Sequence, residues 1–208
     1  MTEFNIIADA HNKPIICNNM IVLDGAAEFI KATPLIIIGD FDKVTKSTLD
    51  HFQNLGTKII KIDDQNSTDL DKGIRYCLEQ HATSINIHNA IGGSRMDHTL
   101  YNTRILKKYY NPKVNIKLFH EDEVMQYFEN CTIKVSGDSK SRFSLLSAPS
   151  AIITSVGLKY DMDDYKLEYG KAESACNSLS SHIAKITISG GIITVQDLSA
   201  ASGIKIIL

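Results

Sequence analysis

The stretch 36–42 reads Ile36-Ile37-Ile38-Gly39-Asp40-Phe41-Asp42, an apolar run that ends in two carboxylates. Successive β-branched residues without polar alternation are typical of a parallel strand that is covered on both faces. In open α/β sheets ligands bind outside the carboxyl ends of such strands, where Asp40 and Asp42 fall. Residues i and i+2 of an extended segment point to the same side, so both carboxylates could bind one Mg²⁺ ion. The alternative is that both are solvated turn residues or helix caps.

The first half of the chain alternates β-branched runs with helical patterns, which predicts βαβ units around a parallel sheet. We expect strands at residues 20–24, 35–39, 58–62 and 84–88. We expect helices at residues 26–31 and 47–55, from Thr68 onward, and at residues 95–110. The third helix has the strongest signal, because Thr68 and Asp71 resemble a capping box and an apolar stripe follows at helical spacing.

Beyond Pro112 the pattern changes to short runs with a period of two, which favours antiparallel strands. The runs are 115–120, 124–128, 132–135, 143–146, 152–155, 165–168, 184–189 and 192–196. Turns such as Ser189-Gly190-Gly191 between them indicate an antiparallel β-sandwich or barrel. We therefore predict two domains: a three-layer α/β domain with a mainly parallel sheet at 1–130, and an antiparallel β-sandwich at 131–208.

The composition excludes several classes of protein. The 208 residues are 43% hydrophobic, which is enough for a packed core. The net charge is -2, and no basic cluster indicates a nucleic acid or an anionic membrane as partner. The cysteines Cys17, Cys77, Cys131 and Cys176 form no Cys-x-x-Cys pair, which argues against structural zinc and fits a reducing cytoplasm. We expect neither a signal peptide nor a membrane span.

Polar residues follow each expected strand of the first half. In chain order they are Asp24 and Gly25, then Asp40 and Asp42, then Asp63, Asp64 and Gln65, and finally Gly92, Gly93, Ser94 and Arg95. In a parallel sheet all four ends share one edge. Several carboxylates would then gather there with Lys72 and Arg95, as expected where Mg²⁺ and cations hold a polyphosphate.

Asp69 and Lys72 lie three residues apart in the first turn of the third helix, so they occupy neighbouring positions. In the functional interpretation, Asp69 adds an oxygen ligand and Lys72 meets a phosphate near the helix N-terminus. The alternative is a capping box with a surface ion pair.

Gly92 and Gly93 precede the fourth helix, and glycines let backbone N–H groups approach a phosphate closely. The alternative is a plain turn, with Asp97 as an acid that favours the helix dipole. We expect His98 to be structural. The sequence has no Gly-x-Ser-x-Gly elbow, dinucleotide fingerprint or P-loop, so it indicates neither nucleophilic catalysis nor those nucleotide sites.

Four segments together resemble the thiamine pyrophosphokinase family, which transfers a diphosphate from ATP to thiamine. They are LDGAA at 23–27, GDFD at 39–42, DQNSTDLDK at 64–72 and GGSRMDHTLYN at 92–102. Weaker matches are GLKY at 157–160 and SACN at 174–177. The resemblance implies an N-terminal α/β domain that binds ATP and Mg²⁺, a C-terminal β-sandwich, and a homodimer with thiamine bound between subunits.

The resemblance also implies roles for individual residues. It places four carboxylates around Mg²⁺, those of Asp24, Asp40, Asp42 and Asp69. It places four polar residues at ATP or the transferring group, namely Gln65, Lys72, Arg95 and Asp97.

In the second half the resemblance implies that Tyr160 stacks on thiamine, with Ser174 and Asn177 lining the pocket. A flat cationic heteroaromatic ring suits an aromatic face. The alternative for Tyr160 is a residue at the edge of the core.

The chain departs from the family pattern at four positions. Ala26 and Glu28 stand where the family usually has glycine and asparagine, Lys43 where it has serine, and Cys176 where serine is common. None of these changes removes an expected metal ligand.

The function expected from this resemblance is in-line attack of the thiamine hydroxyl on ATP, which gives thiamine diphosphate and AMP. Mg²⁺, Lys72 and Arg95 would neutralise the transferring diphosphate, and either Asp42 or Asp97 would accept the hydroxyl proton. Two alternatives remain: a metal-dependent glycosyltransferase that uses a sugar nucleotide, and a non-catalytic sensor of thiamine or nucleotide.

Overall fold

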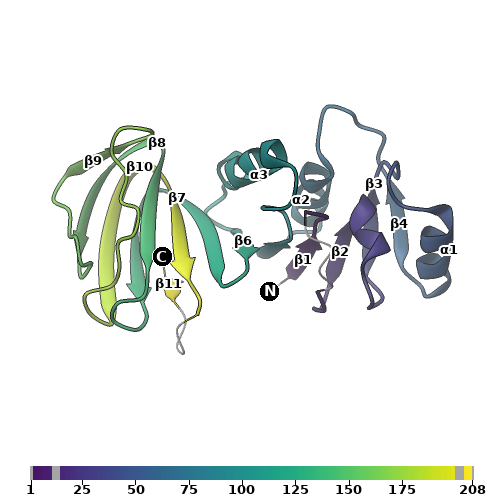
Figure 1. Cartoon of the computed structure of the whole chain (residues 1–208), viewed down its shortest axis with the longest axis horizontal. Helices are drawn as coiled ribbons and strands as arrows, with labels where there is room; N and C mark the ends of the chain where they lie inside the picture. Colours follow the sequence, from purple (N-terminus) through teal and green to yellow (C-terminus); the bar gives the residue numbers. More distant parts are fainter. Residues whose placement is uncertain (1, 11–14, 200–203, 208) are drawn as a thin grey trace. The chain divides into compact units, whose positions relative to one another are not determined.

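The computed structural model describes residues 2–10, 15–199 and 204–207. The chain divides into two compact units, Met1–His120 (unit 1) and Glu121–Leu208 (unit 2) (Figure 1). The boundary lies before the expected position near residue 130, because the run at 124–128 continues into the next one as a single strand of unit 2.

Unit 1 contains a parallel sheet of six strands in the order β4-β3-β2-β1-β5-β6. The strands are β1 (Glu3–Ile7), β2 (Met20–Leu23), β3 (Ile36–Gly39), β4 (Lys58–Lys61), β5 (Ser84–His88) and β6 (Asn115–His120). The chain builds outward from β1 to β4 and then returns to the other side of β1. The strand order therefore reverses between β1 and β5, and in open α/β sheets such a point is where ligands bind.

Helical segments cover both faces of this sheet. They are η1 (Asp24–Glu28), α1 (Lys46–Asn54), α2 (Asp69–Glu79) and α3 (Met96–Lys108). Ile7 and Val22 pack in one cluster with Phe52 of α1, whereas the neighbouring Leu23 contacts the position of Gly73 on α2. Because successive strand residues point to opposite faces, α1 and α2 lie on opposite sides of the sheet.

Gly73 explains how closely α2 approaches the sheet. A Cβ atom at this position would lie 2.9 Å from Leu23 Cδ2 and 3.5 Å from Ile6 Cδ1. The absence of a side chain therefore sets the packing distance of the helix that carries Asp69 and Lys72.

Unit 2 is an antiparallel β unit with its own core. Its strands are β7 (Glu123–Ser136), β8 (Phe143–Val156), β9 (Tyr165–Glu168), β10 (Ile183–Asp197) and β11 (Lys205–Ile207). The order is β7-β10-β8-β9, and β11 pairs with β7. Alternate apolar residues enclose one cluster that includes Ile133, Phe143 and Ile186. The predicted fold class, a parallel α/β part followed by an antiparallel β part, is confirmed.

Several local predictions were wrong. The strand β1 was not predicted, and the helix expected at 26–31 is the short 3-10 segment η1. Three pairs of short runs are continuous strands, namely β7, β8 and β10. Ser189-Gly190-Gly191 is a register shift inside β10 rather than a turn, because Gly190 has φ +106 and lets the strand continue past the irregularity.

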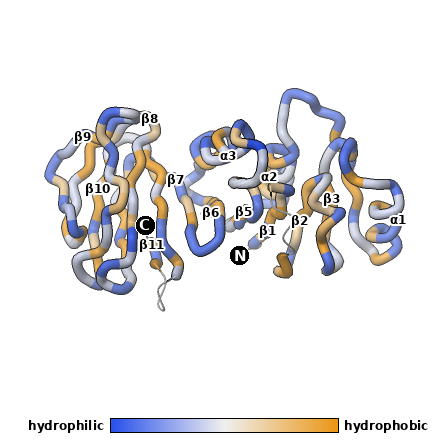
Figure 2. The backbone as a smooth tube through the Cα atoms, in the orientation of Figure 1, coloured by the Kyte–Doolittle hydropathy of each residue, from blue (hydrophilic) through white to orange (hydrophobic). Residues whose placement is uncertain are grey.

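Figure 2 shows hydrophobic colouring along β2 and β3 and hydrophilic colouring on the loop between β4 and α2. Among the residues that the structure describes, no helix combines the length and apolar character that crossing a membrane requires.

Candidate functional site

Three carboxylates meet at the carboxyl edge of the unit 1 sheet. Asp24 follows β2, Asp40 follows β3, and Asp69 begins α2. One oxygen from each lies within 4.8 Å of the others. We call these three residues the acidic trio, and their hard oxygen ligands at this spacing suit a divalent cation such as Mg²⁺.

Gly39 makes the position of Asp24 possible. A Cβ atom on Gly39 would lie 2.7 Å from Asp24 Cβ, closer than real Cβ atoms approach one another. The glycine at the end of β3 therefore lets the Asp24 side chain pass beside the strand.

Asp24 is buried without a compensating donor. Its exposed fraction is 1%, and none of the described residues donates a hydrogen bond to either of its carboxylate oxygens. Burial, followed by the neighbouring carboxyl groups of Asp42, Asp69 and Asp40, raises the pKa of Asp24 to about 6. Close, buried carboxylates repel one another, and a bound cation relieves that repulsion.

Asp40 and Asp42 are not arranged as an extended segment. Phe41 between them has φ 65, a left-handed conformation, so the extended backbone from which the shared side was expected is not present. The chain turns here, and Asp42 N donates a hydrogen bond to Asp40 Oδ1 at 3.3 Å. The Asp42 carboxyl group is not part of the acidic trio, but it lies beside the carboxyl groups of both Asp24 and Asp40.

Lys72 is buried among the carboxylates, with a side chain that is 2% exposed. Its Nζ atom lies 2.8 Å from Asp69 Oδ1 and 3.8 Å from Asp40 Oδ2. Gln65 Nε2 donates to the same Asp40 oxygen at 3.3 Å. Burial alone would raise the pKa of Asp40, but contacts with the Asp42 backbone, Lys72 and Gln65 lower it.

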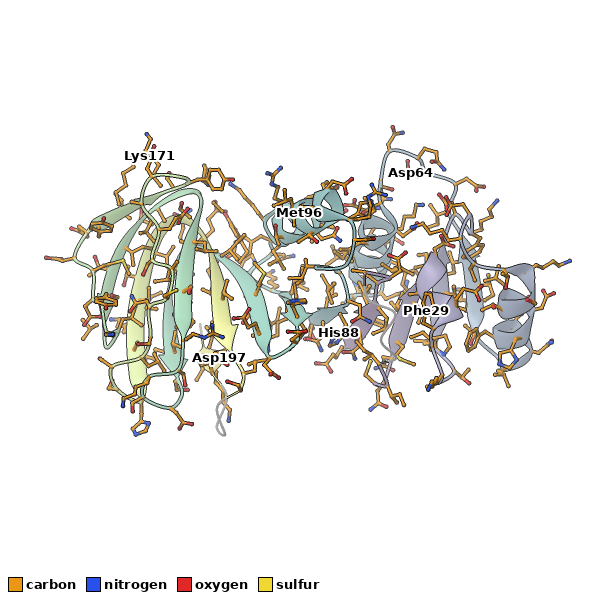
Figure 3. All side chains as sticks on the ribbon, viewed as in Figure 1. Phe29, Asp64, His88, Met96, Lys171 and Asp197 are labelled. Atoms are coloured by element: carbon orange, nitrogen blue, oxygen red, sulfur yellow. The ribbon has the colours of Figure 1, made fainter. Side chains whose placement is uncertain are left out.

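Arg95 and Asp97 pair with each other rather than with the acidic trio. Arg95 Nε and Nη2 donate to the two carboxylate oxygens of Asp97 at 2.9 and 2.6 Å. This pairing holds the pKa of Asp97 well below its usual range. Figure 3 labels Met96, which follows Arg95 at the start of α3, and Asp64 on the loop before α2.

Two adjoining pockets of unit 1 connect these segments. The first, which we call the switch-point pocket, is lined by Ala8 and Asp9 after β1, by Asn89 and Ala90 after β5, and by Arg95. It lies where the strand order reverses, the usual ligand position of such sheets.

The second pocket, which we call the acidic pocket, is lined by Asp24 and Asp69 of the trio. Five residues line both pockets: Ala8, Asp9, Lys43, His98 and Asn102. The two pockets therefore form one continuous site along the sheet edge.

The sequence did not indicate Asp9, indicated Asn102 only as the end of the segment 92–102 without a role, and indicated a structural role for His98. The strand before Asp9 was not predicted, although the run Phe4 to Ile7 was a signal for it. Asn102 lies one helical turn after His98 on α3, and that i, i+4 spacing puts both on one helix face.

In unit 2, Asn177 brings the other predicted residues together. Its Oδ1 atom accepts a hydrogen bond from Tyr160 N at 3.1 Å, and its Nδ2 atom donates to Tyr160 O at 2.9 Å and to Ser174 Oγ at 3.1 Å. Asn177 is 1% exposed, whereas Tyr160 is 60% exposed. The amide thus fixes the backbone of an exposed tyrosine.

The departures from the family pattern have different structural consequences. Glu28 accepts hydrogen bonds from Thr45 N at 2.6 Å and Thr48 Oγ1 at 3.0 Å, so it ties η1 to the start of α1. Ala26 is buried in the core below. Cys176 is exposed, and its N–H group donates to Ser144 Oγ at 3.0 Å.

The sequence matches two family descriptions. "Thiamin pyrophosphokinase, catalytic domain" matches residues 16–118, and "Thiamin pyrophosphokinase, vitamin B1 binding domain" matches residues 130–193. Thiamine pyrophosphokinase 1 of Arabidopsis thaliana is 32% identical over 168 residues, which are 74% of this chain and 61% of that protein. Thiamin pyrophosphokinase 1 of Caenorhabditis elegans is 29% identical over 71% of this chain and 63% of its own length. The chain thus spans about three fifths of these relatives.

Solved structures share the fold. A thiamine pyrophosphokinase from Bacillus subtilis superposes with a TM-score of 0.79 at 22% identity, covering 94% of this chain and 99% of that one. Yeast thiamin pyrophosphokinase superposes with a TM-score of 0.81 at 16% identity, covering 94% and 86%. Together with the two family matches across both units, these relatives show that the chain belongs to the thiamin pyrophosphokinase family.

Proposed function

We propose that this chain transfers the diphosphate of ATP to the hydroxyl group of thiamine, giving thiamine diphosphate and AMP. The observation that carries the proposal is the acidic trio beside the switch-point pocket. A nucleotide in that pocket would reach the trio with its phosphates, because the two pockets share five lining residues. Neither a glycosyltransferase nor a sensor is favoured by the family match.

The acidic trio fits Mg²⁺. Both oxygens of Asp24 are buried without a donor, and the trio supplies three carboxylates within 4.8 Å. When bound, Mg²⁺ would neutralise charge on the transferring diphosphate. Asp24, Asp40 and Asp69 would hold it, and Asp42 beside Asp24 is the fourth carboxylate within reach.

Two cations have different roles in this proposal. Lys72 is buried against Asp69 and Asp40, so it holds both carboxylates in position and balances their charge. Arg95 is exposed in the switch-point pocket, where its guanidinium group can exchange Asp97 for a phosphate oxygen.

The pairing of Arg95 with Asp97 bears on the identity of the general base. A carboxylate with a strongly lowered pKa is a weak proton acceptor. This holds only while the pair is intact: once Arg95 leaves Asp97 for a phosphate oxygen, Asp97 is a candidate proton acceptor beside Asp42. We assign Gln65 to orienting Asp40.

Unit 2 is proposed to bind thiamine through Tyr160, Ser174 and Asn177. The ring of Tyr160 already makes a cation–π contact, since Lys159 Nζ lies 5.1 Å from its centroid. The same face chemistry suits the thiazolium ring of thiamine. We also propose a homodimer with the thiamine site at the subunit interface, and a cytoplasmic location that suits four free cysteines.

The test of the function is to incubate the protein with ATP, Mg²⁺ and thiamine and to separate the products. We expect thiamine diphosphate and AMP in equal amounts. Formation of ADP would contradict diphosphate transfer, and tight thiamine binding without turnover would support the sensor.

Replacement of Tyr160 tests the thiamine site. We expect Tyr160→Ala to raise the KM for thiamine about 5- to 30-fold, because a desolvated cation–π contact contributes about 1–2 kcal/mol. Tyr160→Phe keeps the ring and should stay near the wild-type KM. Tyr169→Ala removes another exposed tyrosine of unit 2 and is the matched control. Equal KM values for Tyr160→Ala and this control would refute the stacking role.

A further inference from the structure

Lys43 lines both pockets, on the loop between β3 and α1. Its side chain is 52% exposed, and its Nζ atom lies 3.2 Å from Asp9 Oδ2, which follows β1. The ion pair therefore joins the loop after one strand to the loop after another, at the boundary between the switch-point pocket and the acidic pocket.

The local structure fixes this position of the side chain. A Cβ atom on Gly25 would lie 3.3 Å from Lys43 Cβ and Cδ and 3.2 Å from Asp9 Oδ2. The missing side chain at residue 25 thus leaves the space that the lysine stem occupies. Val44, the next residue, is buried, and Glu28 accepts a hydrogen bond from the Thr45 backbone. The residues that follow Lys43 in the loop are therefore held in place.

The charge of Lys43 is maintained by its neighbours. Burial alone would lower its pKa, but the carboxylates of Asp9, Asp42 and Asp24 outweigh burial and raise it. The other two cations at the site are less available to a ligand. Lys72 is buried against two carboxylates, and Arg95 is paired with Asp97 through two nitrogen atoms. Lys43 has one exposed partner and an ammonium group with three donors.

We propose that Lys43 binds the polyphosphate of the nucleotide, exchanging its contact with Asp9 for a phosphate oxygen. This inference rests on the proposed function, because it assumes a nucleotide whose phosphates run from the switch-point pocket to the acidic trio. An exposed lysine–aspartate pair contributes little stability and is easily exchanged. A polyphosphate carries several negative charges and accepts stronger, charge-assisted hydrogen bonds. Asp9 therefore competes with the phosphate for Lys43 and forms the ion pair with it in the absence of nucleotide.

The experiment measures binding without turnover. Isothermal titration calorimetry with Mg-ATP, and separately with Mg-tripolyphosphate, is carried out without thiamine on the wild type, Lys43→Ser, Asp9→Asn and the double variant. The matched control is Lys61→Ser, since Lys61 is 57% exposed, pairs with Asp63 at 3.0 Å and lines neither pocket. Circular dichroism checks that each variant is folded.

The exchange predicts effects of opposite sign. Lys43→Ser should weaken the binding of both ligands about tenfold. Asp9→Asn should tighten their binding about three- to tenfold, because it frees the lysine from its ion pair. At least half of the Asp9→Asn gain should disappear in the Lys43→Ser background. Raising the salt concentration should shrink the Lys43→Ser effect.

The outcomes separate this inference from the proposed function. If the wild type forms AMP but Lys43→Ser binds Mg-ATP as tightly as Lys61→Ser does, the role of Lys43 is wrong and the function stands. Weaker binding by both Lys43→Ser and Asp9→Asn would mean that the pair is structural, which also overturns the inference. A wild type that neither binds Mg-ATP nor forms AMP would overturn both.

Discussion

Asp24→Asn should make the metal-free protein more stable while it removes most of the diphosphate transfer. The buried carboxylate has no donor and lies beside three other carboxyl groups, so its charge opposes folding. Asparagine has nearly the same shape, no charge, and an amide that can donate to Asp40 or Asp69. We expect the free energy of unfolding to rise by about 1–3 kcal/mol without Mg²⁺. The rate of AMP formation should fall about 10²- to 10³-fold, because a ligand of the proposed Mg²⁺ is lost.

The measurements are urea unfolding with and without Mg²⁺, together with AMP formation. Mg²⁺ should stabilise the wild type, because a ligand that binds only the folded state shifts the equilibrium, and it should stabilise Asp24→Asn much less. Asp50→Asn, on α1 and outside both pockets, is the control. A variant that loses stability without Mg²⁺ and keeps its response to the ion would show that Asp24 has another role.

The parallel sheet could be predicted where a strand is a continuous apolar run, as in β3, or a regular alternation, as in β5. The stretch Ile36 to Gly39 and the run Ser84 to His88 were both expected and form β3 and β5. β1 was missed, because its sequence Glu3-Phe4-Asn5-Ile6-Ile7 neither alternates regularly nor forms a continuous apolar run. In the structure Asn5 is buried, and its side chain bonds Asn18 O at 2.8 Å and Asn86 at 3.2 Å. Such partners are distant in the sequence, so the pattern could not reveal that this polar residue is satisfied inside the sheet.

The members of the site were easier to predict than its geometry. Carboxylates after parallel strands must share one edge, and three of those expected do lie together. The left-handed conformation of Phe41 and the burial of Lys72 depend on packing around the loop and under α2. The close approach of Asp24 depends on Gly39, which gave no signal beyond ending a strand. Local spacing could therefore nominate the residues but could not orient them.

A second buried carboxylate, Asp71, has the opposite environment and should behave in the opposite way. It is fully buried and accepts hydrogen bonds from Lys108 Nζ at 2.5 Å, from the hydroxyl groups of Tyr101 and Tyr109 at 2.8 Å each, and from Thr68 Oγ1 at 2.9 Å. Burial alone would raise the pKa of Asp71, but these donors outweigh it and lower the pKa to about 2. Burial and, second, the hydrogen bond to Asp71 raise the pKa of Tyr109 to about 12. The residue thus joins the first turn of α2 to α3.

Asp71→Asn should therefore destabilise the protein, by about 2–3 kcal/mol at neutral pH, because buried donors lose a charged acceptor. Lys108 contributes little to this loss of unfolding free energy, since its side chain is 49% exposed and water can replace the carboxylate. Glu79→Gln, an exposed change at the other end of α2, is the control, and urea unfolding is the measurement. A loss of stability no larger than that of the control would contradict the proposed link.

The pH dependence gives an independent test of the same carboxylate. A lowered pKa in the folded state stabilises the protein above the unfolded value of 3.8, and this contribution is lost as the pH falls from about 4 to about 2. The difference in unfolding free energy between the wild type and Asp71→Asn should accordingly be largest above pH 4 and shrink towards pH 2. Because Asp71 lies between Asp69 and Lys72 on the same helical turn, its loss should also lower the rate of AMP formation by disturbing the acidic trio. A pH-independent difference would mean that the side chain stabilises α2 by its shape and not by its charge.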